Sequence, residues 1–297
     1  HTFFEEHKEY HVIHGHVRST AAIYLAIAKK HGLVTIAHSH STSNGSGISG
    51  FVKDTMQLPI RFIADYLFAC SDKAGIWLYG KKATKKSNYR MIPNSVDLER
   101  FSFDETKRNE MRELLGIGHQ EFVIGHIGRF SEPKNHKFLV ELFADYYKYN
   151  RNSRLLMIGD GELYAAIKMQ CEELGISEAV IMPGSRFDTE NFYQVMDAFV
   201  FPSLWEGLPV SVVEAQANGL TCLVSDVITR DVNLTDLITY LPLSDKTQWL
   251  SKIDEAKCIV HKKVSDNNRL KLQSFDSKTV SVELQAFYIE QDKKWKV

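Results

Sequence analysis

The stretch "FVIGHIGRFSEPKNHKFLVELF" (residues 122–143) decides the fold class, because it joins two kinds of hydrophobic pattern. Its first part, 122–128, is a short apolar run broken by glycine, which is typical of a buried parallel strand. Its second part belongs to 134–150, where apolar residues such as Phe138 and Leu142 recur at helical spacing. A strand followed directly by a helix is the repeating unit of a parallel α/β sheet.

The same alternation continues through the second half of the chain. Short apolar runs that fit buried strands lie at 154–159, 179–184, 197–203 and 221–226. Helical patterns lie between them, at 162–175 and from Pro209 onward. Strands that alternate with helices of this length predict a parallel sheet covered on both faces, as in a Rossmann-like domain.

The first hundred residues repeat this pattern less regularly. Candidate strands lie at 11–16, 33–40, 66–71 and 89–95, with helical patterns at 20–32 and 74–80. A length of 297 residues also suggests two domains. We therefore expect an incomplete α/β lobe over 1–104 and a second lobe over 105–275, facing each other across a cleft. A terminal helix within 276–297 would pack back on the first lobe, with these apolar residues available to dock: Val282, Leu284, Phe287 and Ile289.

The composition is that of an ordinary globular protein and argues against several classes of function. Hydrophobic residues make up 44% and charged residues 25% of the chain, and the formal net charge of −1 gives no reason to expect nucleic acid as a partner. The four cysteines have no C-x-x-C spacing, so neither a disulfide scaffold nor a zinc ribbon is indicated. No apolar run approaches the roughly 20 residues that a membrane span needs. We expect reduced cysteines and a cytoplasmic location.

Two cations follow the strand at 122–128. Arg129 comes directly after it, and Lys134 opens the following helix five positions later. Because the strand end then delivers a guanidinium and an ammonium beside a helix N-terminus, the pattern indicates a diphosphate site. Two solvated surface cations are the plain alternative, but Gly125 and Gly128 allow the close backbone approach that a phosphate site needs.

Two acids stand in the largely apolar segment "FPSLWEGLPVSVVEAQANGL" (201–220). Glu206 lies in the turn after a strand, before a helix that Pro209 opens, and Glu214 lies about five residues into that helix. The backbone N–H groups of a helix N-terminus attract anions, whereas ionised carboxylates only accept hydrogen bonds. The combination suits a ligand that carries both an anion and hydroxyl groups. The alternative is one helix-terminal acid and one solvated acid, with no ligand.

Together these segments resemble a known family. The stretch 201–220 is similar to the E-x7-E segment of family 4 retaining glycosyltransferases, which have the two-Rossmann GT-B fold. "GRFSEPKN" (128–135) is similar to the family's Gly-Arg…Lys phosphate-binding segment, and "MIGDGEL" (157–163) to its Gly-Asp-Gly turn. Further similarity lies in "CSDKAG" (70–75) and "IPNSVDLERF" (92–101). The resemblance covers nearly the whole chain and is nearest to members that build bacterial exopolysaccharide or capsule.

The resemblance implies a role for each candidate residue. Arg129 and Lys134 would bind the diphosphate of a sugar nucleotide and stabilise it as it leaves. Glu206 would position the transferred sugar, Glu214 would bind the ribose hydroxyls, and the loop 184–187 would lie against the base, which is uridine in most such enzymes. The implied catalytic residues are His40, Arg129, Lys134 and Glu206. The implied donor-binding residues are Gly128, Arg129, Lys134, Arg186, Phe187, Glu206, Gly207, Leu208, Pro209 and Glu214.

The implied reaction transfers a hexose-type sugar from a nucleotide sugar, expected to be a UDP-sugar, with retention at the anomeric carbon. The acceptor would be a saccharide or a lipid-linked oligosaccharide. Two cations would supply the charge that a divalent ion supplies elsewhere, so neither a metal nor another cofactor is expected. The basic run Lys81–Lys86 is typical of a solvated face, and peripheral contact with the inner face of the plasma membrane is the alternative.

Four histidines leave rival interpretations open. His14 and His16, and likewise His38 and His40, place two imidazoles on the same side of a strand end. Such pairs suit a metal site, so a metal-dependent hydrolase is one alternative. A non-catalytic module that binds nucleotide sugars is another. The resemblance instead puts a single histidine against the transferred sugar, with His40 favoured ahead of His38.

The N-terminal residues depart from the family. Complete relatives begin with a strand and a Gly-rich turn, and nothing in residues 1–40 matches them. The chain also opens at His1 without an initiator methionine. We therefore expect an N-terminally incomplete chain whose donor-binding lobe is intact.

Overall fold

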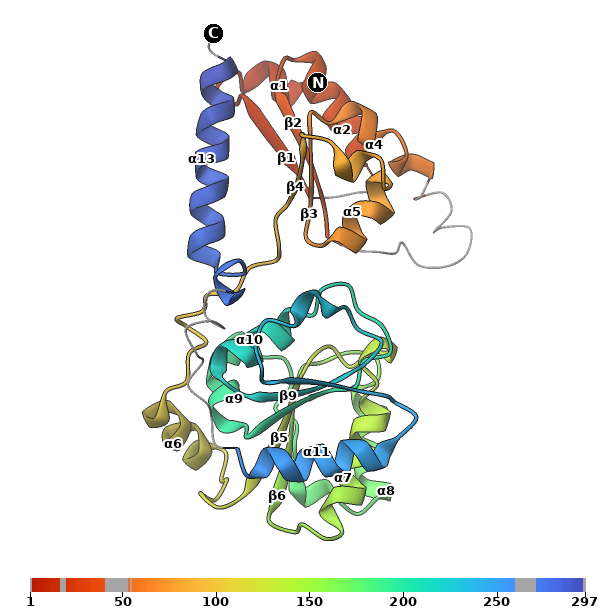
Figure 1. Ribbon diagram of the computed structural model, residues 1–297, viewed down its shortest axis with the longest axis vertical. Coiled ribbons are helices and arrows are strands. Elements are labelled where there is room, and N and C mark those ends of the chain that lie inside the picture. The colour runs from red at the N-terminus through yellow and green to blue at the C-terminus, as the bar shows by residue number, and fades with distance from the viewer. Residues whose placement is uncertain (1, 17–19, 41–52, 54, 260–270, 296–297) are drawn as a thin grey trace. The chain divides into compact units, whose positions relative to one another are not determined.

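The computed structural model describes residues 2–16, 20–40, 53, 55–259 and 271–295. The chain divides into two compact units (Figure 1). The first unit consists of His1–Ser95 and Ser277–Val297, and the second of Val96–Asp276. The division falls at Val96, nine residues before the expected position 105, because Val96 and Phe101 both pack in the core of the second unit.

The first unit is built on a four-stranded parallel sheet. Its strands are, in order across the sheet, β1 (Val12–Gly15), β2 (Val34–Ser39), β3 (Tyr66–Ala69) and β4 (Tyr89–Met91). Its helices are α1 (Thr2–Glu6), α2 (Ala21–Lys30), α4 (Ile60–Ile63), α5 (Asp72–Tyr79), the 3-10 turn η1 (Ala83–Lys85) and the long α13 (Ser277–Trp295). All four strands lie within the runs expected from the sequence.

Alternate residues of these strands face two separate layers, since successive side chains of a strand point to opposite faces. On one face, Ala37 and Leu67 belong to a core formed with α2, α4 and α5, to which Leu25 contributes. On the other face, Ile36 and Phe68 pack in a core with α13. The sheet is therefore covered on both sides (Figure 1).

The helix α13 covers its face of the sheet with one stripe of its surface. Val280, Leu284 and Phe287 lie at helical spacing and pack in the same core as the sheet residues. Val282 is 66% exposed and Ile289 is 48% exposed, so the expectation that these two dock is wrong. They lie on the other side of the helix, because positions two residues away from a helical stripe turn away from it.

The second unit is built on a six-stranded parallel sheet. Its strands are, in order across the sheet, β10 (Ile238–Leu241), β9 (Thr221–Ser225), β8 (Ala198–Phe201), β5 (Phe122–Ile127), β6 (Ser153–Ile158) and β7 (Val180–Ile181). The chain builds the sheet outward from β5 in one direction through β6 and β7, and then in the other through β8, β9 and β10. Open α/β sheets bind ligands beyond the carboxyl ends of the strands at such a reversal, which here lies between β5 and β8.

Helices cover both faces of this sheet. One face packs against α7 (His136–Tyr147), α8 (Tyr164–Glu173) and α11 (Lys246–Lys257). The other packs against α9 (Thr189–Val195) and α10 (Val210–Asn218), beside which lies α6 (Glu105–Leu114). The 3-10 turns are η2 (Glu132–Lys134), η3 (Ser177–Ala179) and η4 (Arg230–Val232). None of the described helices of either unit combines the length and apolar character that crossing a membrane requires.

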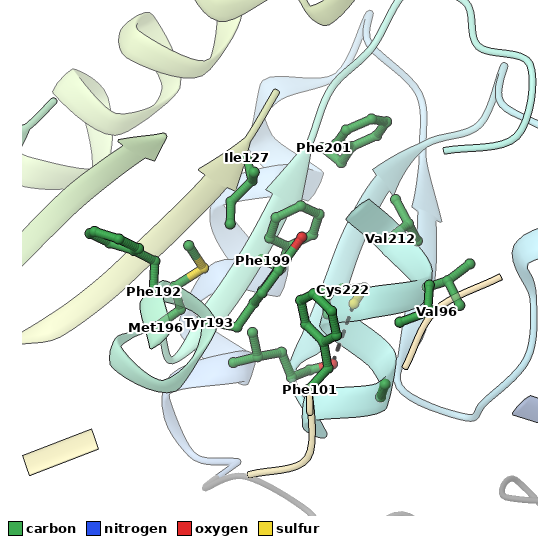
Figure 2. Close-up of a cluster of buried hydrophobic side chains, with 14 of the residues drawn as sticks. Val96, Phe101, Ile127, Phe192, Tyr193, Met196, Phe199, Phe201, Val212 and Cys222 are labelled. Atoms are coloured by element: carbon green, nitrogen blue, oxygen red, sulfur yellow. Dashed lines mark hydrogen bonds between the residues drawn. The ribbon is translucent and has the colours of Figure 1, made fainter. Parts of the chain in front are cut away.

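An aromatic core lies between the sheet and α9 and α10 (Figure 2). Phe199 comes from β8 and Tyr193 from α9, and the rings of Phe101 and Tyr193 meet edge to face with centroids 5.6 Å apart. Gly125 of β5 is required here, because a Cβ at that position would collide with the side chain of Met196. This packing fixes β5 and β8, whose carboxyl ends carry the candidate site.

Candidate active site

Two loops meet at the carboxyl ends of β5 and β8. The backbone N–H of Leu204 donates to the carbonyl oxygen of Pro133 at 2.7 Å, and the Asn135 side chain donates to the carbonyl oxygen of Pro202 at 3.1 Å. Asn135 precedes the first residue of α7 without a side-chain cap bond and has a left-handed φ of 55°, a conformation that asparagine tolerates better than most residues. These bonds join the loop that carries Lys134 to the loop that carries Glu206.

Lys134 and Glu206 form an ion pair at this junction. The ammonium of Lys134 lies 2.6 Å from Oε1 of Glu206, and the two side chains are only 19% and 13% exposed. The ammonium also lies 4.7 Å from the ring centroid of Phe201 at the end of β8. Gly128 leaves room for this arrangement, because a Cβ there would lie 3.2 Å from Cδ of Lys134. The structure thus brings together a cation and an acid that the sequence placed 72 residues apart.

Lys134 does not open the following helix, as the sequence suggested. It ends the 3-10 turn η2, and α7 begins two residues later at His136. The reason is local, because Pro133 and the left-handed Asn135 make a separate turn of this segment. Lys134 therefore belongs to the loop rather than to the helix.

The N-terminus of α10 lies directly after Glu206. Pro209 is the residue before the first helical turn, not the first helical position that was expected, and the helix has no side-chain cap hydrogen bond. Gly207 and Leu208 lead into it and are partly exposed. A helix N-terminus carries a partial positive charge and free N–H groups. This end of α10 can therefore receive an anion next to the Lys134–Glu206 pair.

Arg129 lies in the same loop after β5 that carries Lys134. Its side chain is 73% exposed and pairs with Glu162 at 3.1 Å. Two backbone hydrogen bonds join this loop to the loop after β6. The N–H of Phe130 donates to the carbonyl oxygen of Asp160, and the N–H of Leu163 donates to the carbonyl oxygen of Phe130, each at 3.0 Å. A surface ion pair of this kind contributes little stability, so Arg129 is free to exchange Glu162 for a ligand.

The turn Gly159-Asp160-Gly161 permits these hydrogen bonds between the two loops. Gly159 and Gly161 have φ values of +144° and +155°, which side chains rarely adopt. A Cβ at Gly159 would collide with the carbonyl oxygen of Gly128, and a Cβ at Gly161 with that of Phe130. The two glycines therefore let one loop backbone lie against the other and set the position of Arg129.

Glu214 lies inside the unit, on α10. It accepts a hydrogen bond of 2.7 Å from the hydroxyl of Tyr193, which comes from α9. Burial raises the pKa of Glu214, and the Tyr193 hydrogen bond and the charge of Arg100 oppose that rise. A largely buried carboxylate with one firm partner retains an oxygen that can accept further hydrogen bonds.

The loop after β7 carries the remaining candidate residues of this unit. Arg186 pairs with Asp188 at 2.9 Å and lies 5.4 Å from the ring centroid of Phe192 on α9. Phe187 is 98% exposed. Its ring is thus available on the surface of the same unit, while Arg186 is held by its neighbours.

Two buried histidines support the floor of the site. Nδ1 of His126 lies 2.8 Å from the carbonyl oxygen of Val200, and His136 stacks on Phe130 with centroids 4.0 Å apart. Burial, with a smaller contribution from the nearby charge of Lys134, lowers the pKa of His126 to about 4 and that of His136 to about 2. Both rings are therefore neutral near pH 7, beneath the cation.

His40 lies in the first unit, whereas the other candidate residues lie in the second. Its Nδ1 lies 3.0 Å from Oδ1 of Asn94, and its Nε2 lies 2.8 Å from Nδ1 of His16. It belongs to a cluster with His14, His16 and His38 at the ends of β1 and β2. Burial lowers the pKa of His14 to about 4 and that of His38 to about 2, and the neighbouring imidazoles add to the effect.

Sequence reasoning missed several residues that hold the site. Tyr193 and Phe201 look like ordinary core aromatics, and only their contacts with Glu214 and Lys134 reveal them. Asn135 could have been found, since asparagine before a helical pattern is a known cap signal. His126 and His136 carried no signal beyond their place in and after an apolar strand.

The comparisons with known proteins agree with this architecture. Residues 107–239 match the family Glycosyl transferases group 1. Over 260 residues the chain is 34% identical to EpsF of Bacillus subtilis (strain 168), named as a glycosyltransferase, covering 85% of this chain and 67% of EpsF. Over 232 residues it is 28% identical to the UDP-Gal:alpha-D-GlcNAc-diphosphoundecaprenol alpha-1,3-galactosyltransferase of Escherichia coli, covering 74% of this chain and 59% of that protein. The chain thus spans about three fifths to two thirds of the length of these relatives.

A solved structure shows the same fold. Anabaena Alr3699/HepE in complex with UDP matches with a TM-score of 0.77 and 17% identity, over 97% of this chain and 81% of that chain. The same protein in complex with UDP-glucose matches with a TM-score of 0.75 and 18% identity, over the same shares of the two chains. The expected GT-B fold is confirmed, and by its sequence and its two parallel α/β sheets this chain belongs to the group 1 glycosyltransferases.

Proposed function

We propose that the protein transfers a hexose-type sugar from a UDP-sugar to a saccharide or lipid-linked acceptor in polysaccharide synthesis, with retention and without a metal. The observation that carries the proposal is the Lys134–Glu206 pair at the sheet's reversal point, beside the N-terminus of α10. Supporting evidence comes from relatives: HepE was crystallised with UDP and with UDP-glucose, and the E. coli relative is named for transfer from UDP-Gal to a diphosphoundecaprenol-linked sugar.

The diphosphate would occupy the space between Lys134 and the N-terminus of α10. In the free protein Lys134 neutralises Glu206, so both charges have a partner at 2.6 Å. When a diphosphate binds, the ammonium gains a second anion, and Glu206 turns its free oxygen to the hydroxyls of the sugar. Glu206 is thus a positioning group for the sugar, and the charged floor it shares with Lys134 is already in place before the donor arrives.

The hard step is expulsion of the diphosphate. The bond between the anomeric carbon and the diphosphate breaks, the acceptor oxygen bonds to the same face of the carbon, and the acceptor's proton leaves with the diphosphate. Negative charge therefore accumulates on phosphate oxygens, where Lys134, the α10 N–H groups and Arg129 supply positive charge. Arg129 would leave its exposed pairing with Glu162 to do so. A contact of His40 with the transferred sugar stays a prediction from the family resemblance.

The nucleoside would lie along α9 and α10. Glu214, held by Tyr193, would accept hydrogen bonds from the ribose hydroxyls. The base would lie against the loop that carries Arg186 and Phe187. Phe187 offers an exposed ring for stacking, which suits any base and prefers none strongly.

The proposal is tested by measuring UDP binding and turnover for matched variants. Lys134→Gln removes the ammonium and is expected to weaken UDP binding about 10- to 100-fold, because a charge-assisted hydrogen bond contributes roughly 1.5–3 kcal/mol. Glu206→Gln is expected to weaken UDP-sugar binding more than UDP binding. Lys137→Gln, an exposed lysine on the adjacent first turn of α7, serves as the control and is expected to bind as the native protein does.

Calorimetry with UDP and UDP-sugars gives the affinities, and release of UDP in the presence of acceptor gives turnover. Equal UDP affinity in Lys134→Gln and in the control would refute the assignment of the diphosphate site. UDP binding that depends on Lys134 without any sugar transfer or donor hydrolysis would instead identify a binding module. Unchanged turnover after exhaustive chelation of divalent ions is the expected result for the metal-free mechanism.

A further inference from the structure

The first unit gathers four imidazoles on one face of its sheet. His14 lies on β1 and His38 on β2, and His16 and His40 follow each of them by two positions, so all four point the same way. The ring centroids are 4.3 Å apart for His14 and His16, 4.1 Å for His38 and His40, and 5.2 Å for His14 and His38. The register of the parallel strands β1 and β2 produces this cluster. His14 pairs with Ile36, so the same register continued by two residues places His16 beside His38.

Three of these rings are anchored by their outer nitrogens. Nδ1 of His14 lies 2.6 Å from the hydroxyl of Tyr288, Nε2 of His38 lies 3.3 Å from the carbonyl oxygen of Ile92, and Nδ1 of His40 lies 3.0 Å from Oδ1 of Asn94. A carbonyl oxygen only accepts, so the outer nitrogens of His38 and His40 carry their protons. Their inner nitrogens then present lone pairs to the cluster. Histidines that bind metals are oriented in this way by an outer acceptor.

The inner nitrogens are close enough to share one ion. His14 Nε2 and His38 Nδ1 are 3.2 Å apart, and His40 Nε2 and His16 Nδ1 are 2.8 Å apart. The ligand atoms of His14, His16 and His38 all lie within 4.8 Å of one another. Two nitrogens on one tetrahedral zinc ion, each about 2.0–2.1 Å from the metal, lie about 3.3 Å apart. His40 does not belong to that set of three, and its Nε2 lies against Nδ1 of His16 instead.

We propose that His14, His16 and His38 form a binding site for one divalent transition-metal ion, with zinc as the best fit. Imidazole nitrogens select zinc, nickel and copper over magnesium and calcium, which prefer oxygen. Three protein ligands leave the fourth position of a tetrahedral ion to water or to another small ligand. The proposal does not rest on the glycosyltransferase chemistry, and it leaves His40 outside the ligand set.

The test uses the untagged full chain, stripped of metal with a chelator and dialysed. Zinc is titrated in competition with a chromophoric chelator, and cobalt(II) is added in parallel as a spectroscopic probe. We expect one equivalent of zinc with a Kd below 1 μM as an order-of-magnitude expectation, cobalt absorption bands typical of tetrahedral nitrogen ligation, and no response to magnesium. His16→Gln, at the exposed position, is expected to weaken zinc binding at least ~10-fold.

Further variants separate loss of a ligand from loss of the fold. His38→Gln is expected to abolish the tetrahedral cobalt spectrum, and Tyr288→Phe to weaken zinc binding about 10-fold through the orientation of His14. His119→Gln, an exposed histidine of the second unit, is the control and is expected to leave stoichiometry and affinity unchanged. Absence of one-to-one binding, or equal affinity in His16→Gln and the control, would overturn the proposal. UDP binding measured on the same samples reports separately on the second unit.

Discussion

Lys134 and Glu206 form a largely buried ion pair, which costs stability but can also bind a ligand. Each side chain is more than four fifths buried, and removing one partner of such a pair leaves an uncompensated charge. The pair is thus maintained at a cost that an apolar pair would not carry. A ligand that offers a phosphate to Lys134 and hydroxyls to Glu206 satisfies both groups, which is the physical basis for preferring a ligand-binding role over a structural one.

His136 provides a test of the floor of the site at the level of one residue. Among the described residues neither of its ring nitrogens has a hydrogen-bond partner, and burial lowers its pKa to about 2. In the unfolded chain a histidine titrates near pH 6.5, so below that pH the unfolded state binds more protons than the folded state. The free energy of unfolding therefore falls as the pH falls, by up to about 1.4 kcal/mol per pH unit for this group.

His136→Phe keeps the ring and removes the titrating nitrogens. We expect its unfolding free energy to fall about 2 kcal/mol less than that of the native protein between pH 7.5 and 5.0, measured by urea denaturation with the fluorescence of buried Trp249 as the signal. His119→Gln, at an exposed position, should keep the native pH dependence. An identical pH dependence in His136→Phe would show that folding does not lower the pKa of this histidine.

Individual site residues were partly predictable. Residue types at strand ends pointed to Lys134 and Glu206 as candidates that would lie close together, because parallel strands bring their carboxyl ends to one edge. Their pairing was not predictable, since it depends on the bond from Leu204 to Pro133 between loops far apart in the chain. The same holds for Glu214, whose partner Tyr193 lies on another helix.

At the scale of elements, the loops after β5 and β6 act as one piece of backbone. Gly159→Ala would force a methyl group against the carbonyl oxygen of Gly128 at a φ of +144°. We expect a loss of roughly 3 kcal/mol or more in unfolding free energy, since strained backbone and steric overlap add, together with weaker UDP binding because the Arg129 loop must move. Thermal and urea unfolding with UDP titration would measure both.

Gly175→Ala is the matched control for this change. Gly175 also has a positive φ, +66°, but a Cβ there would meet nothing within 4 Å. Its replacement should cost only the 1–2 kcal/mol, roughly, of a left-handed alanine and should leave UDP binding unchanged. Equal losses in the two variants would mean that the contact between the loops contributes nothing beyond backbone strain.

The elements that the sequence analysis missed have a physical explanation. The helix α6 carries Arg112 at a buried position, where its guanidinium donates to the carbonyl oxygens of Val195, Gly118 and Glu121. Arg112 occupies a buried position that is usually apolar, so the apolar periodicity that predicts a helix was absent from α6. The cap signal was present, as Asp104 accepts from the N–H groups of Thr106 and Lys107. The central strands, by contrast, were evident because both of their faces are buried.

At the scale of the whole molecule, the chain forms two units with separate cores. The expected boundary after residue 104 was too late, because the segment from Val96 to Phe101 contributes core side chains to the second unit. The chain enters the second unit at Val96 and leaves it after Asp276. The N–H of Val96 donates to the carbonyl oxygen of Phe275 at 2.7 Å, so the beginning and the end of this unit lie side by side. Hydrophobic patterning identifies elements, but it does not say which core a loop residue joins.

The dependence of the first unit on α13 can be tested with one pair of variants. Phe287→Ala removes a buried ring from the core with Ile36 and Phe68 and is expected to destabilise the first unit by about 3–5 kcal/mol. Val282→Ala, on the exposed side of the same helix, should change stability by less than about 0.5 kcal/mol. Amide exchange should lose protection in β1–β4 and keep it in β5 and β6. A uniform loss over both units would mean that they unfold as one.

The place of α13 in the chain has a consequence for biosynthesis. The second unit is continuous, whereas the first needs a helix that the ribosome makes after the second unit. Residues 96–276 can therefore complete their tertiary structure while the strands of the first unit still expose Ile36 and Phe68. We expect the second unit to mature first, reversing the usual vectorial order, and nascent chains to need protection from aggregation until α13 has been made.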